Sequence, residues 1–451
     1  MAQALVDARH PAATGPRNTN VRIAIIGTGI AGMGAGWALQ RGGHDLTVFE
    51  AGNYIGGHTN TVPVDVHGRV WPVDTGFIVF NSWTYPNFIR LLDHLGVPSR
   101  PTTMGFSVRD ERNGLEYAGA SVATLFAQWR NVLRPSHLRM IADILRFNRE
   151  APPVLQSDDH RTTLGDYLAA HRYSRAFIER YIVPMGSAIW SAPEGDLLRF
   201  PIRFFVRFFH NHGMLSVDER PVWRTVTGGS SNYIPLLVQG FRDRIRLDAP
   251  VQSVARDTEG VTITSRFGVE RFDHVIFACH SDQAVALLGD ASDNERAILG
   301  ALPYQANEAV LHTDVRMMPR TRSTWSAWNY HVLGDSSRPV ALTYDMNILQ
   351  GFESTPKRFL VTLNRSDAID PATIIKRIRY QHPVYSVSGV AAQARWSEIN
   401  GTRRTWFCGA YWRYGFHEDG LWSGLRVAAG LGSLAPWGEP IAEDRPIAVP
   451  V

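Results

Sequence analysis

The chain has 451 residues, of which 44% are hydrophobic, and its formal net charge is +4. A chain of this length is expected to form two or more domains with substantial cores. Its longest apolar runs are far shorter than the about 20 residues that span a bilayer, so no transmembrane helix is expected. The two cysteines, Cys279 and Cys408, lie in apolar, strand-like contexts, which favours buried free thiols in a reducing cytoplasm over a disulfide or a metal site.

The basic residues are nearly all arginine, because only Lys357 and Lys376 are lysines. They alternate with acids along the chain and form no recognised nucleic-acid module, so nucleic acid is not an expected partner. Residues 129–147 and 199–209 interleave arginine with apolar side chains. We favour arginines at the edge of a core, with peripheral contact with a membrane as the alternative. Residues 1–20 lack the apolar stretch of a secretory signal and are expected to form a disordered tail.

Residues 21–50 predict a strand, a tight turn, a helix and a second strand. Gly27, Gly29 and Gly32 follow the first strand with GxGxxG spacing, and Glu50 ends the second strand. Gly27 is expected to make the turn, Gly29 to admit a pyrophosphate to the backbone, and Gly32 to let helix and strand touch. The helix N-terminus favours a diphosphate, and Glu50 can accept hydrogen bonds from ribose hydroxyls. This segment therefore predicts a site for an adenine dinucleotide.

A glycine pair, Gly56 and Gly57, comes shortly after this acid. Glycines here allow close backbone approach to a long ligand such as a flavin dinucleotide, whereas a domain that binds only NAD has no general need of them. An ordinary surface turn is the alternative. The position just after Glu50 favours the flavin.

The central part of the chain predicts a second, mixed region. Residues 73–80 read as a strand with a glycine kink, and residues 86–220 read mostly as helix. Strand signals return at 245–279, and strands alternate with turns over 301–365.

The end of the chain carries a second glycine-rich turn between a strand and a helix. The strand covers residues 405–407, Gly409 follows it, and Gly420 with Leu421 is expected to open a helix that runs to residue 431. The helix N-terminus would suit the negative charge of a reduced flavin near N1 and C2=O. Two such turns at opposite ends of the chain favour one cofactor that spans both.

Together these motifs resemble the FAD-dependent amine-oxidase superfamily, which includes monoamine and polyamine oxidases, protoporphyrinogen oxidase and carotenoid desaturases. The segments FDHVIFAC (272–279) and CGAYWRYGFHEDGLWSG (408–424) carry the resemblance beside the glycine motifs. DTGFIVFN (74–81) resembles more narrowly a bacterial branch of NAD/FAD-binding proteins associated with modification of membrane fatty acids.

The resemblance implies an α/β fold with a Rossmann-like FAD-binding domain of the GR2 type and an inserted α+β substrate-binding domain. The FAD-binding domain would comprise residues 21–85, 221–300 and 401–440. The substrate-binding domain, with a helical subdomain, would comprise residues 86–220 and 301–400.

The resemblance also implies a set of cofactor-binding residues for non-covalent FAD. Val251 would contact adenine through its backbone, Thr75, Gly76 and Phe77 would line the isoalloxazine, and Asp419, Gly420 and Leu421 would hold its ribityl and pyrimidine side. The full set is Gly27, Gly29, Ile30, Ala31, Gly32, Glu50, Ala51, Gly56, Gly57, His58, Thr59, Thr75, Gly76, Phe77, Val251, Gly409, Asp419, Gly420 and Leu421.

The sequence also departs from the superfamily. His58 stands where amine oxidases usually carry arginine, and neither lysine is in a context suited to positioning water near the flavin. Tyr411 and Trp412 could supply one aromatic wall of an amine cage, but the sequence identifies no second wall. These departures weaken the amine-oxidase interpretation.

The expected activity is an FAD-dependent oxidoreductase that dehydrogenates an apolar, lipid-derived substrate such as a fatty-acyl chain by hydride transfer to flavin N5. Catalytic candidates are Tyr411, Trp412, His417, Glu418 and His312. Candidates for substrate contacts are Tyr304, Asn307, Trp328, Asn329, Tyr344 and Asn347.

For each candidate residue, a buried structural role is the alternative. One alternative activity is an amine oxidase that yields imine and hydrogen peroxide, and another is a non-catalytic flavoprotein accessory to a lipid-modifying enzyme. The sequence does not identify the electron acceptor.

Overall fold

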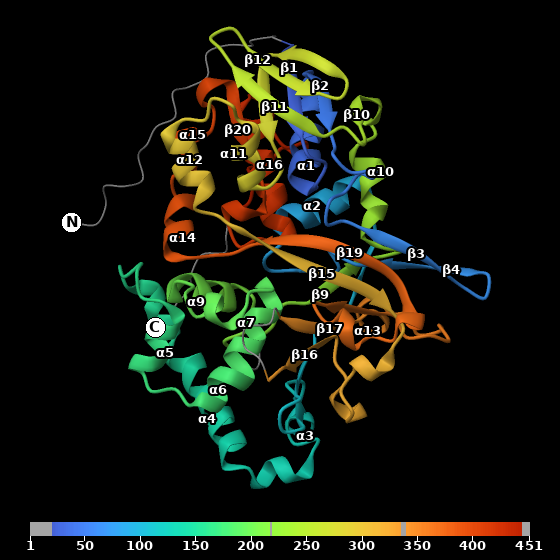
Figure 1. The fold of residues 1–451 in the computed structure, drawn as a ribbon, viewed down its shortest axis with the longest axis vertical. Helices are drawn as coiled ribbons and strands as arrows, with labels where there is room; N and C mark the ends of the chain where they lie inside the picture. The colour runs from blue at the N-terminus through green and yellow to red at the C-terminus, as the bar shows by residue number, and fades with distance from the viewer. Residues whose placement is uncertain (1–19, 217–218, 335–339, 444–451) are drawn as a thin grey trace.

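A five-stranded parallel sheet, in the order β10-β2-β1-β14-β20, forms one end of the molecule (upper half of Figure 1). Its strands are β1 (Arg22–Ile26), β2 (Asp45–Phe49), β10 (Ile245–Arg246), β14 (His274–Phe277) and β20 (Thr405–Phe407). The structure, a computed structural model, describes residues 20–216, 219–334 and 340–443, so nearly all of the expected tail lies outside the described residues. The strands come from three separate parts of the chain, and their apolar runs suit a buried parallel sheet.

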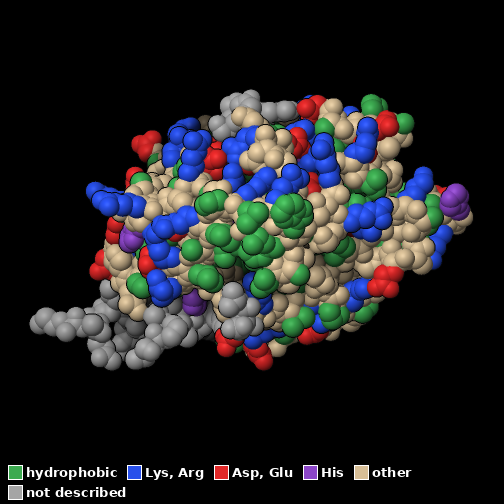
Figure 2. Space-filling model, turned by 90° about the horizontal axis from the view of Figure 1, so that it is seen from below, with side chains coloured by type: hydrophobic (Ala, Val, Ile, Leu, Met, Phe, Trp, Pro, Cys, Tyr) green, Lys and Arg blue, Asp and Glu red, His purple; other side chains and the backbone are tan. Residues whose placement is uncertain are grey.

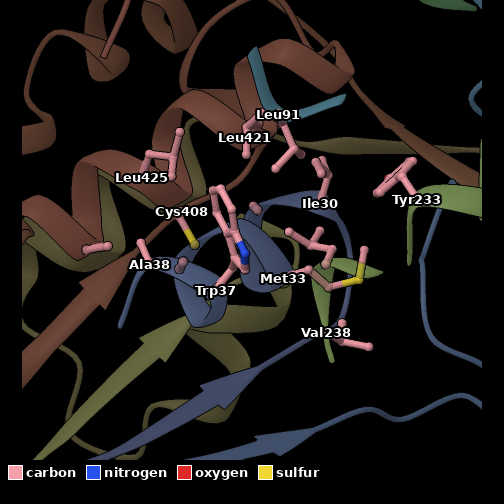
Figure 3. Packing of buried hydrophobic residues seen from close by; sticks show 14 of the residues in the cluster. Ile30, Met33, Trp37, Ala38, Leu91, Tyr233, Val238, Cys408, Leu421 and Leu425 are labelled. Atoms are coloured by element: carbon pink, nitrogen blue, oxygen red, sulfur yellow. The ribbon is translucent and has the colours of Figure 1, made fainter. Parts of the chain in front are cut away.

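Two glycine-bearing helices, α1 (Ile30–Arg41) and α16 (His417–Gly430), pack directly against each other beside this sheet. A Cβ atom on Gly32 would lie 2.1 Å from the carbonyl oxygen of Gly27, and one on Gly424 would lie 2.1 Å from that of Ala31. Figure 3 shows Trp37 of α1 and Leu425 of α16 in the same apolar cluster. Only glycine allows this approach of backbone to backbone.

A seven-stranded sheet, in the order β19-β15-β18-β17-β16-β7-β8, forms the middle of the molecule. Its strands are β7 (Phe106–Asp110), β8 (Leu115–Ala118), β15 (Tyr304–His312), β16 (Trp328–Val332), β17 (Ala341–Asp345), β18 (Leu360–Leu363) and β19 (Ile374–Pro383). The expectation of mostly helix over 86–220 is wrong for β7 and β8, which form a hairpin at the edge of this sheet. Each has only four or five residues. The pairing of β7 with β16, more than 200 residues away in sequence, fixes β7 as a strand, and β8 pairs in turn with β7.

The remaining strands form three small sheets. These are β3 (Thr61–Val66) with β4 (Arg69–Asp74), β5 (Phe80–Asn81) with β6 (Ser99–Pro101) and β9 (Trp223–Val226), and β11 (Val251–Arg256) with β12 (Val261–Ser265) and β13 (Gly268–Phe272).

Helices cluster at the end of the molecule opposite the parallel sheet (lower left of Figure 1). The α-helices of this part are α3 (Val122–Leu125), α4 (Pro135–Glu150), α5 (Leu164–Ala170), α6 (Arg175–Phe177), α7 (Val183–Trp190), α8 (Glu194–Leu197) and α9 (Ile202–Asn211), and a short 3-10 helix, η1 (Trp129–Leu133), lies between α3 and α4. The other α-helices are α2 (Pro86–Leu95), α10 (Ile234–Leu237), α11 (Ser281–Leu287), α12 (Asp293–Gly300), α13 (Met346–Gln350), α14 (Val387–Gln393) and α15 (Trp396–Ile399). Among the described residues, no helix is both long enough and apolar enough to cross a membrane.

The two arginine-bearing segments have different surroundings. In α9 the phenylalanines Phe204, Phe205, Phe208 and Phe209 are all buried, so the core-edge interpretation is confirmed for residues 199–209. In residues 129–147, by contrast, Trp129, Val132, Leu133, Leu138 and Leu145 are exposed. The arginines of this second segment therefore do not simply edge a core.

The close contact of α1 with α16 predicts a large effect of a single methyl group at Gly424. Gly424→Ala should lower the free energy of unfolding by about 1–3 kcal/mol, because the new Cβ meets a backbone carbonyl that no rotamer change can move. Thermal and urea unfolding measure this change.

The matched control is Gly300→Ala, at the end of α12, where an added Cβ meets no atom within 4 Å. It should change stability by less than about 0.5 kcal/mol. Equal stability of the two variants would show that the helices can separate at no cost.

Candidate functional site

A cavity of about 1130 Å³ runs between the parallel sheet and the seven-stranded sheet, and continues among the helices. Its lining includes both glycine-rich turns, from Gly27 to Ala31 and from Gly409 to Gly420. Its volume exceeds the about 300–1,000 Å³ of ordinary ligand pockets. The cavity therefore has room for an extended ligand and for a second molecule beside it.

The first glycine turn follows the carboxyl end of β1. Gly27 has φ +109°, which favours glycine, and a Cβ on Gly29 would meet no atom within 4 Å. Gly29 therefore faces open space at the start of α1, whereas Gly32 is packed against backbone. These positions match the three separate tasks that the sequence assigns to the glycines, and the helix N-terminus behind Gly29 suits a diphosphate.

Glu50 lies beside this turn at the end of β2. Its carboxylate accepts hydrogen bonds from the Thr28 N–H (2.9 Å) and hydroxyl (2.5 Å) and from the Gly52 N–H (2.8 Å). These bonds hold the acid at the edge of the cavity. Gly57 lies on the other side of the turn, where an added Cβ would come within 3.1 Å of the Gly29 Cα. The glycine pair after β2 and the glycine turn after β1 thus meet at one place.

The second glycine turn lies against the first. A Cβ on Gly420 would lie 2.8 Å from the Ile30 side chain. The expectation that Gly420 and Leu421 open the helix is wrong, since α16 begins at His417 and the Gly420 N–H already donates to the Phe416 carbonyl (3.1 Å). The glycine is needed here for close packing against α1 rather than for a free N–H.

His417 is held inside the cavity wall by three aromatic neighbours. Its ring stacks on Phe77 with centroids 3.7 Å apart, and Phe88 meets it edge-on. Its Nε2 shares a hydrogen bond of 2.8 Å with the Tyr233 hydroxyl, which also bonds to Thr59. Burial lowers the pKa of His417 well below its usual range, with a smaller contribution from His58. The imidazole is therefore neutral at physiological pH.

Three further histidines, His58, His280 and His382, line the cavity together. The rings of His58 and His382 lie 5.4 Å apart, and His280 stacks on Tyr304 at 4.1 Å. Burial, and then the neighbouring histidines, lower the pKa of His58 to about 3 and that of His382 to about 4, and burial also lowers the pKa of His280. This wall of the cavity is polar but uncharged at neutral pH.

The residues present fit an extended dinucleotide. His58 Nε2 is a buried ring nitrogen without a hydrogen-bond partner among the described residues, beside an open glycine cradle and an acid. Buried polar atoms are nearly always paired, so an unpaired one beside a cradle is the expected mark of a ligand-binding position. FAD carries the phosphate, ribose and ring oxygens that these groups can bind.

Most of the expected cofactor residues lie in the cavity wall. Those that line it are Gly27, Gly29, Ile30, Ala31, Glu50, Ala51, Gly56, Gly57, His58, Gly76, Phe77, Val251, Gly409 and Gly420. The catalytic candidates Tyr411 and His417 and the substrate candidates Tyr304, Trp328 and Tyr344 line it too. Gly32, Thr59, Thr75, Asp419 and Leu421 lie just behind the wall. Thr75, for example, donates to the Asn60 carbonyl and bonds to the Tyr380 hydroxyl, which fixes the turn that carries Gly76.

Glu418 is placed as a helix cap rather than as a catalytic group. Its carboxylate accepts the N–H groups of Asn87 (3.0 Å) and Phe88 (2.9 Å), at the N-terminus of α2. Burial raises the pKa of Glu418 to about 7. The next residue, Asp419, likewise accepts the N–H groups of Tyr414 and Phe416 and fixes the turn before α16. Neither carboxylate lines the cavity.

Five other candidates also lie outside the cavity wall, and each has a structural partner. The Trp412 indole donates to the Phe407 carbonyl, and His312 bonds to Thr362 within the seven-stranded sheet. The partners of the three amides are Gln305 and His382 for Asn307, Ser326 and Thr343 for Asn329, and Phe352, Lys357 and Phe359 for Asn347. Their polar side chains serve buried strands and turns, a role that sequence cannot distinguish from a pocket.

Sequence reasoning missed His280 and His382. His280 comes three residues after the end of β14, whose carboxyl end lies beside that of β1. Ligands of open parallel sheets bind at the carboxyl ends of the strands, so the position of His280 after a buried strand was a usable signal. His382 lies near the end of β19, and only the tertiary structure brings it to the same wall.

The two thiols remain free and uncharged. Cys408 is buried, and burial raises the pKa of Cys279, which lines the cavity, to about 12. Among the residues that the structure describes, no cluster of His, Cys, Asp or Glu could hold a metal ion.

Comparison with known proteins shows which proteins this chain resembles in sequence. A family model described as flavin-containing amine oxidoreductase matches residues 30–332. The AofH protein of Mycobacterium tuberculosis, described as a flavin-containing monoamine oxidase, is 24% identical over 364 residues, which cover 74% of each chain. An L-amino-acid oxidase of Siganus canaliculatus is 24% identical over 257 residues, which cover 55% of this chain and 46% of the oxidase.

Solved structures agree in fold. Cyclohexylamine oxidase from Brevibacterium oxydans superposes with a TM-score of 0.66 and 16% identity, over 92% of this chain and 99% of the other. A fatty acid isomerase from P. acnes that produces CLA gives a TM-score of 0.66 and 15% identity, over 92% of this chain and 98% of the other. Both similarities concern the fold.

Gly29→Val should weaken flavin binding without unfolding the protein. The backbone at Gly29 has φ −63° and ψ 172°, which any residue adopts, and the new side chain enters open space where a diphosphate would lie. We expect affinity for FAD to fall at least about tenfold, a loss of about 1.4 kcal/mol or more. Isothermal titration of the apoprotein with FAD measures this. Gly195→Val, where an added Cβ also meets nothing, is the control and should keep wild-type affinity.

The neutral histidines predict acid lability. Because the pKa values of His58 and His382 are lower in the folded state, the unfolded chain binds more protons below about pH 6.5. Stability should therefore fall as the pH decreases from about 6.5 towards 4. His382→Gln should reduce this slope by up to about 1.4 kcal/mol per pH unit in denaturant titrations. An unchanged slope would contradict the buried neutral state.

Proposed function

Because the chain belongs to the family of flavin-containing amine oxidoreductases and is thus an FAD-dependent oxidoreductase, we propose that it dehydrogenates an apolar, lipid-derived substrate. A fatty-acyl chain is the favoured substrate. One observation carries the proposal: the arm of the cavity that leads away from the glycine turns is walled by apolar side chains of the helical region. These are Leu125, Ile141, Ile144, Leu145, Met185 and Ile189.

Charge in the cavity wall supports the same choice. Among the described lining residues the only carboxylate is Glu50, which belongs to the glycine turn, and the only cation is Arg220. A cationic polyamine would therefore find no carboxylate in the apolar arm. A chain that ends in a carboxylate could be held by the Arg220 guanidinium.

Bound FAD supplies an acceptor for a hydride from a C–H next to a double bond or heteroatom. The tasks of the chain are to exclude water from the apolar arm, to orient the carbon and, where a C–C bond is desaturated, to take the second proton. His280 is suited to the last task. Its Nδ1 lies 3.1 Å from the Gln381 side-chain oxygen, so Nδ1 carries the proton and Nε2 is left as an acceptor. Its lowered pKa keeps the ring neutral.

The second candidate function is an amine oxidase that yields imine and hydrogen peroxide. The names of the proteins that this chain resembles favour this candidate. The third candidate, from a different class, is a flavoprotein that assists a lipid-modifying enzyme without itself turning over.

Anaerobic photometry distinguishes the three candidates. The purified holoprotein is mixed in turn with fatty-acyl substrates and with a panel of amines, and the flavin absorbance is followed. Bleaching by acyl chains supports the proposal, and bleaching by amines alone overturns it in favour of the amine oxidase. A flavin that nothing reduces, on a protein that stimulates a partner enzyme, supports the accessory role.

The apolar arm predicts that Met185→Trp should narrow the path of a long chain. KM for long acyl substrates should rise about tenfold or more, since the larger ring overfills a shaped pocket, while flavin content stays at the wild-type level. Steady-state kinetics over a series of chain lengths measures the effect. A variant with unchanged KM for the longest chains would exclude this arm as the acyl path.

A further inference from the structure

We infer that residues 122–150, which form α3, η1 and α4 and which we call the mouth segment, dock on a membrane that contains anionic lipid. One part of this inference rests on the proposed function, namely that a lipid substrate enters the cavity from the bilayer. Binding to the membrane is itself a separate, measurable property.

The mouth segment gathers exposed apolar side chains. Of the fifteen large hydrophobic residues that are exposed in the described part of the chain, six lie in these 29 residues. They are Val122, Trp129, Val132, Leu133, Leu138 and Leu145. Trp129 and Leu133 are 76% and 73% exposed, and exposed apolar side chains gathered in one place mark an interaction site.

Helix α4 has apolar residues on two sides. His137, Met140 and Phe147 are buried at helical spacing, and they attach α4 to the rest of the protein. Leu138 and Leu145, which are seven residues apart, form a second stripe that faces outwards. A helix that needed only one buried face would not keep this second stripe apolar.

The charge of the mouth segment complements anionic lipid. It contains five arginines, Arg130, Arg134, Arg139, Arg146 and Arg149, and two acids. Asp143 is buried and paired with Arg139 and Arg146, and Glu150 pairs with Arg146 and Arg149, so the segment keeps a net charge of +3. Figure 2, viewed from the end where α3 and α4 lie, shows hydrophobic side chains gathered in the middle of this face, with Lys and Arg above and to the left of them. Apolar side chains beside arginines are typical of proteins that lie in the headgroup region.

The same segment is part of the cavity wall. Leu125, Ile141, Ile144 and Leu145 all line the cavity, and Leu145 is also exposed. The exposed stripe and the apolar arm are thus continuous through α4. An acyl chain that leaves a bilayer at this face would reach the cavity without crossing water.

A second copy of the chain is a less suitable occupant. In a symmetric dimer through this face, five arginines of each copy would approach those of the other, and like charges at an interface oppose association. A bilayer with anionic headgroups meets the same arginines with opposite charge.

Flotation with lipid vesicles tests the inference on the full holoprotein. Vesicles of phosphatidylcholine alone are compared with vesicles that also contain phosphatidylglycerol. We expect binding to the anionic vesicles, weaker binding at high salt, and a loss of about fivefold in the partition constant for each of Arg130→Gln and Arg134→Gln. The double variant Trp129→Glu/Leu133→Glu should lose binding almost completely.

The matched control is Val269→Glu on β13, which is 68% exposed but belongs to the small sheet β11-β12-β13 at the other end of the molecule. It should bind vesicles like the wild type. Unchanged flavin content and circular dichroism establish that each variant is folded. Failure of the wild type to bind anionic vesicles at low salt would overturn the inference, and so would full binding by the double variant.

Two further readouts separate the possible outcomes. Analytical ultracentrifugation without lipid would overturn the inference if it revealed a dimer that the double variant abolishes. A water-soluble short-chain substrate should reduce the flavin of the double variant at the wild-type rate. If the wild type binds vesicles but no acyl substrate reduces its flavin, the proposed function fails while the docking stands.

Discussion

The site depends on one contact: the backbones of α1 and α16 touch through glycine. Gly424 lies against the Ala31 carbonyl and Gly420 against the Ile30 side chain, and neither position has space for a Cβ. This contact joins a helix near the start of the chain to one near its end, and it brings their N-terminal turns into one cavity wall. A larger residue would push the helices apart and, with them, the two halves of the nucleotide site.

Around that contact the protein avoids fixed charge. Burial keeps His58, His382 and His417 neutral, and Glu418 is used to cap α2. Neutral imidazoles can donate or accept hydrogen bonds without the cost of a buried ion. Towards the helical region the wall becomes apolar, and it ends at the mouth segment, where apolar side chains and arginines are exposed together. The wall of the cavity thus changes from polar near the glycine turns to apolar near the mouth segment.

Local sequence was sufficient where function rests on backbone. Gly27, Gly29, Gly32 and Glu50 lie where the strand-turn-helix pattern predicts, because a glycine turn after a buried strand has few alternative geometries. It was insufficient for side chains whose partners are remote. His312 and Glu418 belong to structural hydrogen bonds, while His280 and His382 come to the cavity from separate strands. A polar residue in an apolar stretch is compatible with either role, and only its neighbours decide.

By itself the sequence determined the α/β class, the two glycine turns and the expectation of a flavin dinucleotide, since these follow from short-range rules of strand, turn and helix. Only the tertiary structure decided that β7 and β8 are strands and that α16 begins at His417. It also decided that the arginine-rich segments differ, since the phenylalanines of 199–209 are buried whereas several apolar side chains of 129–147 are exposed. The physical reason is that burial is a property of packing between distant parts of the chain. An amphipathic pattern states that a face must be covered, but not whether protein or lipid covers it.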